Sequence, residues 1–239
     1  MTKVSLEKLL ETGAHFGHQT KRWNPRMSEF VYGVRDGVHI FDLIKTKSAM
    51  EDALGAISDA SKKDKLILLV GTKKQAKAKV KEVGQATGIC YVDERWLGGT
   101  LTNFEQIRKS INTLNRLKEE MEEGKYDSYT KKERLLISRD IEKLEKNVGG
   151  LQKLDRIPDM MIIVDIRREH AAIKEGAKNE VEMVGIVDTN ADPNEVRWPV
   201  PMNDDSPQAL SYMLDLIKES LSVKKKQVKK VKAKKAKKK

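Results

Sequence analysis

The chain has 239 residues, a formal net charge of +11, 38% hydrophobic residues and a single cysteine. This length suffices for a hydrophobic core in one large domain or two small ones. No apolar run approaches the roughly 20 residues of a membrane-spanning helix, and no secretory signal is recognisable, so we expect a cytoplasmic protein with no membrane partner. The lone Cys90 excludes an internal disulfide framework and an all-cysteine metal site.

The positive charge is concentrated at the end of the chain. Residues 224–239 hold 11 lysines and no acid, so residues 1–223 carry 36 basic and 36 acidic groups. Within this body the net charge is +5 over residues 1–100, +1 over 101–155 and −6 over 156–223. We therefore expect the basic N-terminal half to face a polyanion, and the acidic C-terminal half to be left for solvent or protein neighbours.

Strands and helices alternate along most of the chain. Apolar runs predict strands at 66–70, 160–164 and 184–187. Helical spacing of apolar residues predicts helices at 44–60, 73–86, 167–178 and 207–221. Because the strands are apolar on both faces, they are typical of a parallel sheet covered on both sides. The pattern predicts an α/β sandwich with right-handed crossovers.

The middle of the chain departs from this alternation. Two segments with apolar residues every three or four positions each open with capping-box spacing, Thr102 to Glu105 and Thr130 to Glu133, and the second ends at Gly149-Gly150. We predict an inserted coiled-coil hairpin of two antiparallel helices, each about 18 residues long; the alternative is a further pair of core helices. The expected division is an α/β domain over 1–102 and 150–222, the hairpin over 103–149 and a tail over 223–239.

One segment resembles an enzyme site. Gly71-Thr72-Lys73 follows a predicted strand, and a helix N-terminus there could hold phosphate, but no nucleotide-binding motif is matched. Five lysines then fall within nine residues that contain no acid: Lys73, Lys74, Lys77, Lys79 and Lys81. They would repel one another unless a phosphate backbone lay against them, although a solvated cationic face is equally compatible with the pattern.

Other chemistry-bearing residues favour structural roles. Asp165 and Asp188 end predicted strands, where they could bind a metal, but turn formation is the better interpretation because no nucleophile or base accompanies them. His15, His18 and Cys90 make a weak zinc pattern, and imidazoles that donate to phosphate or pack beside Phe16 explain the histidines better. We expect no catalytic residue, metal, cofactor or small-molecule substrate. The runner-up is a phosphate- or nucleotide-handling enzyme that uses Gly71, Thr72, Lys73 and Asp165 or Asp188.

Two stretches look suited to RNA recognition. Residues 19–26 interleave three cations with Trp23 and amide side chains, and residues 94–104 join an Arg-Trp pair to two glycines. Because a tryptophan is more often a core residue than a stacking platform, the cations are the better candidates for contact.

These residues carry a family resemblance. The segments 15–25, 70–76, 95–104, 185–190 and 203–205 resemble, in order and spacing, the bacterial small-subunit ribosomal protein S-two family over about residues 4–222. The resemblance implies a flavodoxin-like (Rossmann-like) three-layer sandwich with a parallel sheet and an inserted helical hairpin. It also implies a non-enzymatic protein that binds 16S ribosomal RNA between the head and body of the small subunit. Its other partners would be neighbouring small-subunit proteins, including the messenger-binding protein S-one, whose docking it would support.

The residues expected to contact or support rRNA follow from the motifs and the resemblance together. They are His15, His18, Lys21, Arg22, Trp23, Asn24, Arg26, Lys73, Lys74, Lys77, Arg95, Trp96, Thr100, Asn103 and Arg108. Two segments, Arg197-Trp198 and Ser206-Pro207, depart from the family pattern.

The lysine-rich tail also departs from the family pattern. Its composition predicts disorder in the free protein and RNA binding without sequence preference, through Lys224, Lys225, Lys226, Lys229 and Lys230. A solvated tail with no partner is the alternative.

Overall fold

The structure is a computed structural model that describes the backbone of residues 3–236 and the side chains of residues 3–222. The strands are β1 Phe16–Gln19, β2 Val31–Arg35, β3 Val38–Phe41, β4 Ile67–Val70, β5 Cys90–Val92, β6 Met160–Ile163, β7 Glu182–Val187 and β8 Trp198–Pro201. The helices are α1 Leu6–Glu11, α2 Leu43–Lys62, α3 Lys77–Thr87, α4 Phe104–Glu122, α5 Lys131–Val148, α6 His170–Lys178 and α7 Pro207–Ala236. Short 3-10 helices lie at η1 Thr20–Arg22, η2 Pro25–Phe30, η3 Gly149–Leu151 and η4 Pro193–Glu195.

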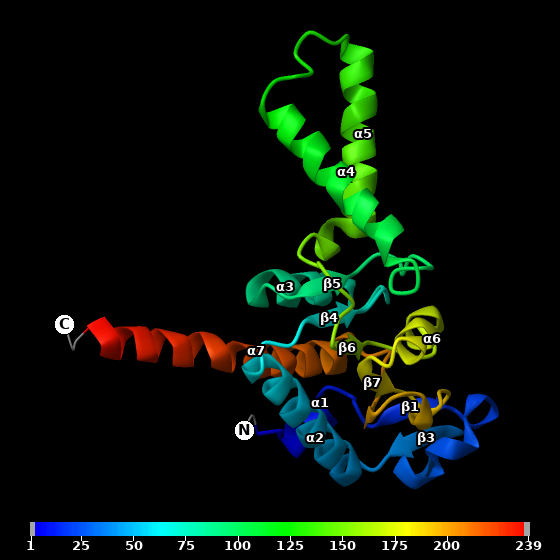
Figure 1. Cartoon of the computed structure of the whole chain (residues 1–239). Helices are drawn as coiled ribbons and strands as arrows, with labels where there is room; N and C mark the ends of the chain where they lie inside the picture. The colour runs from blue at the N-terminus through cyan, green and yellow to red at the C-terminus, as the bar shows by residue number, and fades with distance from the viewer. Residues whose placement is uncertain (1–2, 237–239) are drawn as a thin grey trace.

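The central element is a five-stranded parallel sheet with the order β5-β4-β6-β7-β8. Counted from β4 along the chain, this order is 2-1-3-4-5, the flavodoxin-like arrangement. The predicted fold class is therefore confirmed (Figure 1). The apolar runs became β4, β6 and β7, and nearly all of their residues are fully buried, as expected for strands covered on both faces.

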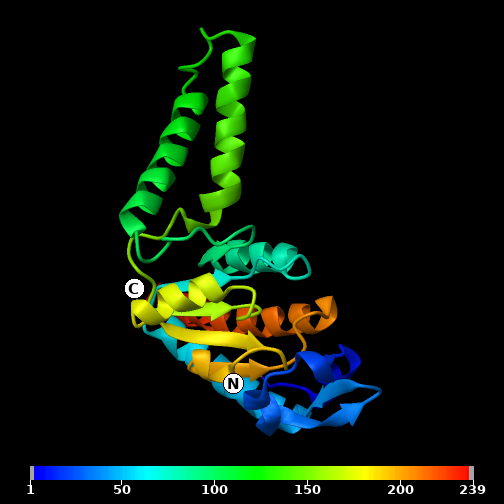
Figure 2. The same ribbon diagram turned by 90° about the vertical axis from the view of Figure 1, so that its right-hand side faces the viewer.

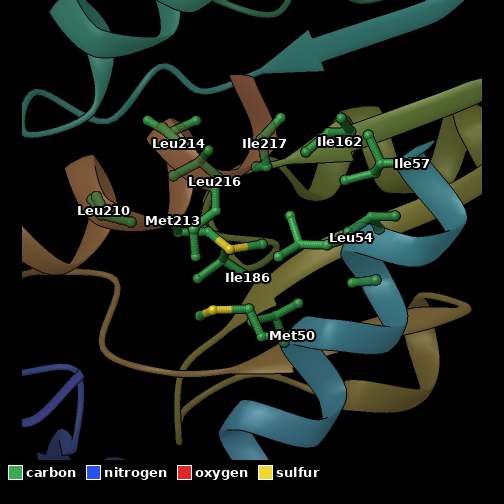
Figure 3. Packing of buried hydrophobic residues seen from close by; sticks show 14 of the residues in the cluster. Met50, Leu54, Ile57, Ile162, Ile186, Leu210, Met213, Leu214, Leu216 and Ile217 are labelled. Carbon is green, nitrogen blue, oxygen red and sulfur yellow. The ribbon is translucent and has the colours of Figure 1, made fainter. Parts of the chain in front are cut away.

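Two hydrophobic clusters cover the two faces of this sheet. One cluster joins α2, α3 and α7 to the sheet. Figure 3 shows its centre, where Met50 and Leu54 of α2 meet Ile186 of β7 and Met213 of α7. The other joins α6 and the bases of α4 and α5 to the opposite face. The sheet thus lies between two helical layers (Figure 2).

A second sheet, which the sequence did not predict, is formed by the N-terminal segment. Strands β1, β3 and β2 pair antiparallel in that order, with a register irregularity in each pairing. Only His39 and Phe41 of these strands are fully buried, so the strands lack the apolar alternation that identifies a strand in sequence. The small sheet places the segment that follows β1, residues 20–30, at the end of the molecule near β7 (Figure 1).

The inserted segment forms two antiparallel helices, α4 and α5, that project from the α/β body (Figures 1 and 2). The predicted capping box at Thr130 and Glu133 is present. The capping box predicted at Thr102 and Glu105 is absent. Asn103 is the N-cap residue of α4, and the N–H of Thr102 donates to Glu175 Oε2 instead. The fully buried residues of α4, which are Ile107, Ile111 and Leu114, lie in its first two-thirds, and coiled-coil packing along the whole hairpin stays a prediction.

The C-terminal helix is longer than the apolar periodicity predicts. Helix α7 continues past Leu221 to Ala236. The predicted RNA-contacting lysines, Lys224 to Lys230, lie beyond the last described side chain, so their role and the predicted disorder of residues 223–239 stay predictions. No helix within the described residues is both long and apolar enough to span a bilayer.

Candidate nucleic-acid interface

The first predicted recognition segment is fixed to the sheet by His18. Its Nδ1 lies 3.0 Å from Asp188 Oδ1, and its Nε2 lies 3.0 Å from Asn190 Nδ2. The backbone N–H of His18 donates to Thr189 Oγ1 at 2.8 Å. At Gly17, an added Cβ would lie 2.5 Å from Thr189 Cγ2, so only glycine permits this close approach. His18 therefore anchors β1 to the loop after β7, and it is a supporting residue.

The cations that follow β1 are exposed. Lys21 and Arg22 lie in η1, and within the described side chains neither has a carboxylate within 4.0 Å. Arg26 is also exposed but pairs with Asp192. Asn24 caps η2 by accepting from the backbone N–H of Arg26 at 3.0 Å, which is a local structural role. Lys21 and Arg22 are thus the cations of this segment that are free to meet phosphate.

Trp23 lies at the edge of the same segment. Its ring is 36% exposed and stacks on His39, with ring centroids 4.7 Å apart. Burial lowers the pKa of His39, and neither of its ring nitrogens has a hydrogen-bond partner among the described atoms. A neutral imidazole behind a half-exposed indole leaves one ring face available for stacking.

The second recognition segment, residues 95–103, is organised by a carboxylate that the sequence did not single out. Glu175 Oε1 accepts from Trp96 Nε1 at 3.0 Å and from the Gly99 N–H at 2.8 Å. Glu175 Oε2 accepts from the N–H groups of Leu101 at 2.9 Å and Thr102 at 3.1 Å. Burial opposes ionisation of Glu175, but these hydrogen bonds outweigh it and lower its pKa. An ionised carboxylate on α6 therefore holds the loop in one conformation.

The two recognition segments lie over the same face of the sheet. Met27, which follows the first segment, belongs to the same buried cluster as Trp96 and Leu101 of the second. Ile107 of α4 belongs to it as well, and it precedes the exposed Arg108. The exposed Lys21, Arg22, Arg95 and Arg108 thus lie on segments anchored in one buried cluster, and a common RNA-binding side for them stays a prediction.

Lys73 does not belong to this surface. Its side chain is buried, and Nζ lies 2.6 Å from Asp204 Oδ1, 2.7 Å from Asp205 Oδ1 and 3.1 Å from Asp165 Oδ2. The prediction that Lys73 contacts phosphate is corrected here, because three carboxylates from distant parts of the chain already neutralise it.

The charges of this cluster are strongly coupled. Burial, followed by the carboxylates of Asp188 and Asp165, raises the pKa of Asp204 to about 8, against the opposing effect of Lys73. Burial alone would lower the pKa of Lys73, but the surrounding aspartates raise it. The two shifts describe one balance: Lys73 keeps its charge, and a proton on Asp204 relieves the repulsion among the carboxylates.

Two of the four remaining lysines of the predicted cationic run are paired as well, whereas Lys74 and Lys81 are exposed. Lys77 pairs with Glu94, and Lys79 lies 2.7 Å from Asp215 and 3.0 Å from Glu82. Helix α3 packs through Val80 on the sheet face opposite to the recognition segments. For Lys73, Lys77 and Lys79 the expected repulsion is therefore wrong, because other elements supply the acids that the local sequence lacks. Lys74 stays exposed at the start of this segment.

Two further predicted contact residues are buried. Trp96 is 7% exposed and donates to Glu175, and Thr100 is 1% exposed and donates to the Leu97 carbonyl at 2.6 Å. Their prediction as direct contacts is corrected to a supporting role. His15 is partly buried, tilts against Phe16 and has its pKa lowered by burial. Asn103, in contrast, is exposed at the start of α4.

One group of side chains could hold a metal ion. Among the described residues, the ligand atoms of His18, Asp188 and Asp204 lie within 4.8 Å of one another. The hydrogen bond to Asp188 raises the pKa of His18 in spite of its burial. The zinc alternative considered from the sequence fails in its detail, because neither His15 nor Cys90 joins this group.

The carboxyl edge of the sheet therefore contains ion pairs where enzymes of this fold class place their ligands. Thr72, after β4, donates through N–H to Glu169 Oε1 at 3.0 Å, and Lys73 fills the space beside Asp165 after β6. An α/β scaffold with a closed edge and cations on its helical side is typical of a structural nucleic-acid-binding protein.

Comparison with known proteins gives the family. Residues 9–223 match the family model of ribosomal protein S2. The chain is 45% identical over 218 residues to the small ribosomal subunit protein uS2 of a Nitratiruptor species, covering 91% of this chain and 82% of that protein. It is 40% identical over 221 residues to the uS2 protein of Geotalea uraniireducens, covering 92% and 86%. The chain belongs to the ribosomal protein S2 family, whose members are structural proteins of the small subunit and not enzymes.

Proposed function

We propose that this protein binds 16S rRNA through the side of its α/β body that carries Lys21, Arg22, Arg95 and Arg108, between the head and body of the small subunit. The observation that carries the proposal is the convergence of two exposed cationic segments, far apart in sequence, over one face of the sheet. Unpaired cations on a rigid loop lose little entropy on binding, and they meet phosphates without first breaking an internal ion pair. The address of such a protein is the cytoplasmic ribosome.

The test is binding to small subunits that lack this protein. Wild-type protein should cosediment with them through a cushion of moderate salt, and Lys21→Gln with Arg22→Gln should weaken this binding by about tenfold, with a shallower salt dependence. Lys47→Gln on α2, which packs on the other sheet face, with Lys63→Gln just after this helix is the matched control and should bind as wild type. Equal binding to unrelated RNAs once the lysine-rich tail is removed would instead indicate a free RNA chaperone.

Docking of the messenger-binding protein S-one is the second part of the proposal. It is supported by an apolar groove of about 440 Å³ between α1, the small sheet and the start of α2. Tyr32 is 81% exposed, Ile44 73% and Leu10 57%, which is unusual for large apolar side chains at a protein surface. Tyr32→Asp with Ile44→Asp should lower S-one retention while subunit binding persists; unchanged retention would contradict this part.

A further inference from the structure

Four of the thirteen acids of residues 156–223 are buried inside the protein. Asp165, Glu169, Asp188 and Asp204 are each less than a tenth exposed. Lys73 forms ion pairs with Asp165 and Asp204. The N–H groups of Thr72 and Thr189 donate to Glu169 and Asp188. The expectation that this half of the chain is a surface repelled by polyanions therefore does not follow from its net charge.

The basic residues of the same segment lie outside. Four of its seven cations fall between residues 167 and 178, and all four have exposed side chains: Arg167, Arg168, Lys174 and Lys178. The two acids in this stretch point inward, since Glu169 is 3% exposed and Glu175 is bound by the 95–103 loop. The exposed side of α6 and the turn before it therefore carry four cations, and no acid within residues 167–178 is fully exposed.

These cations are not neutralised within the protein. Among the side chains that the structure describes, none of the four has a carboxylate within 4.0 Å; Arg168 instead donates from Nε to Thr72 Oγ1 at 3.2 Å. Like charges spaced four residues apart on a helix, as in Lys174 and Lys178, destabilise it slightly unless an anion lies against them.

The surface next to α6 suits a phosphate backbone better than a protein. The loop over 95–103 is tied to α6 by Glu175 and adds the exposed Arg95 and the open Gly98, where a Cβ would meet nothing within 4 Å. Among the described residues, no large apolar side chain is exposed on α6 or on this loop. Protein interfaces depend on buried aromatic and apolar anchors, whereas RNA backbones need cations and close approach.

We infer that the exposed face of α6, together with the 95–103 loop, is a second rRNA-backbone contact of this protein. The inference rests on the proposed function and extends it to a helix in the formally acidic half of the chain. Met27, Trp96 and Ile173 belong to one buried cluster, so α6 covers the same sheet face as the segments that carry Lys21 and Arg95 (Figure 2). The proposed contact surface then includes η1, α6 and the start of α4, which lie over one face of the sheet.

Neutralising two cations tests the energetic part of this inference. Lys174→Gln with Lys178→Gln keeps helix propensity and should weaken binding to protein-depleted small subunits by about tenfold. The slope of log Kd against log salt should fall by roughly 1.5, since each phosphate contact contributes about 0.7 to 0.9. Lys174→Arg with Lys178→Arg should restore both values, and Lys47→Gln on α2 with Lys63→Gln just after this helix should change neither.

Directed cleavage tests the identity of the ligand. Cys90 is 2% exposed and burial raises its pKa to about 11, so an iron chelate will attach selectively to a new surface cysteine. Ala177→Cys places the chelate between Lys174 and Lys178, and it should cleave 16S rRNA in the bound complex. Thr20→Cys beside Lys21 is the positive control, and Glu51→Cys on α2 is the negative control.

The outcomes separate the two proposals. Cleavage from residue 20 but not from residue 177, with unchanged binding of the glutamine variant, overturns the α6 contact and leaves the proposed function intact. Weakened binding without cleavage from residue 177 assigns α6 to an acidic protein neighbour and also overturns it. Wild-type protein that fails to bind depleted subunits refutes the proposed function itself.

Discussion

Removing the buried cation at the edge of the sheet gives the sharpest test of the electrostatic account. In Lys73→Met, the aspartates that surround Nζ lose their counter-ion while the apolar volume is largely kept. Asp205 is half exposed, so its share is small; Asp165 and Asp204 are buried and carry most of the cost. Breaking a buried pair costs about 3–5 kcal/mol, and because Asp204 can take up a proton, we expect about 3 kcal/mol at neutral pH.

The pH dependence of this loss is the distinguishing result. The pKa of Asp204 is about 8 in the folded protein and 3.8 for an ordinary aspartate. A folded-state pKa above the unfolded value means that stability is present at low pH and is lost as the pH rises through the folded-state pKa. Without Lys73 that pKa rises further, so Asp204 of the variant stays protonated while that of the wild type ionises, and the deficit of the Lys73→Met variant should widen between about pH 7 and pH 10.

The assay is urea unfolding of both proteins across that pH range. A chelator belongs in every sample, because His18, Asp188 and Asp204 could bind a cation that would mask the effect. The exposed Lys74 offers a matched control, and Lys74→Met should cost less than about 0.5 kcal/mol at every pH. If Lys73→Met behaves like Lys74→Met, or if its deficit shrinks with rising pH, the reasoning about this cluster is refuted.

Three further predictions concern the loop, the hairpin base and the tail. Glu175→Gln replaces one acceptor oxygen by an NH2 group, so one of the two donor pairs, Trp96 with Gly99 or Leu101 with Thr102, loses its acceptor, which should cost about 2–3 kcal/mol of folding free energy. The pKa of Glu175 is lowered in the folded protein, so its ionisation stabilises the fold above about pH 4.5, and this contribution is lost as the pH falls. The Tm of the variant should therefore fall less steeply with decreasing pH than the Tm of the wild type. Gly150→Ala would place a Cβ 2.2 Å from the Tyr91 carbonyl oxygen and should cost about 3 kcal/mol by urea unfolding, whereas Gly98→Ala, in open space, should be neutral. Deleting residues 224–239 should flatten the salt dependence of rRNA binding measured by filter retention; an altered choice of binding site would contradict a purely electrostatic tail.

The strands that the sequence could predict are those whose burial is complete on both faces. Continuous apolar runs identified β4, β6 and β7, because a strand in the middle of a parallel sheet has no solvent-facing side. The edge strands were missed: β5 has three residues, and β8 contains two prolines. Proline is confined to sheet edges because it cannot donate to the hydrogen-bond ladder. For the same reason, a proline in a sequence argues against predicting a strand there.

Predictions about charge failed wherever the partner lies far away in the chain. Lysines without acids nearby in sequence found them on other elements, at Glu94, Asp204 and Asp215. The capping box predicted at Thr102 was likewise displaced by Glu175, 73 residues further on. The spacing of residues in the sequence predicts only which groups can interact within one helix or loop. Which charges are buried and paired depends on the topology, which brings distant strand ends together.

The closed edge of the sheet explains how a fold shared with many enzymes serves as a scaffold. Open α/β sheets bind ligands beyond the carboxyl ends of their strands, where the strand order reverses, and here that point lies between β4 and β6. A phosphate arriving there would have to displace Asp165 and Asp204 from Lys73 and would meet the buried Glu169 beside Thr72. The same ion pairs withdraw Asp165 and Asp204 from the surface, so the net charge of the formally acidic half overstates the charge that it exposes. The ion pairs around Lys73 therefore close the ligand-binding edge of the sheet and also keep acids away from the cationic helical side. A substitution that breaks these ion pairs and opens the edge should also make that side less cationic.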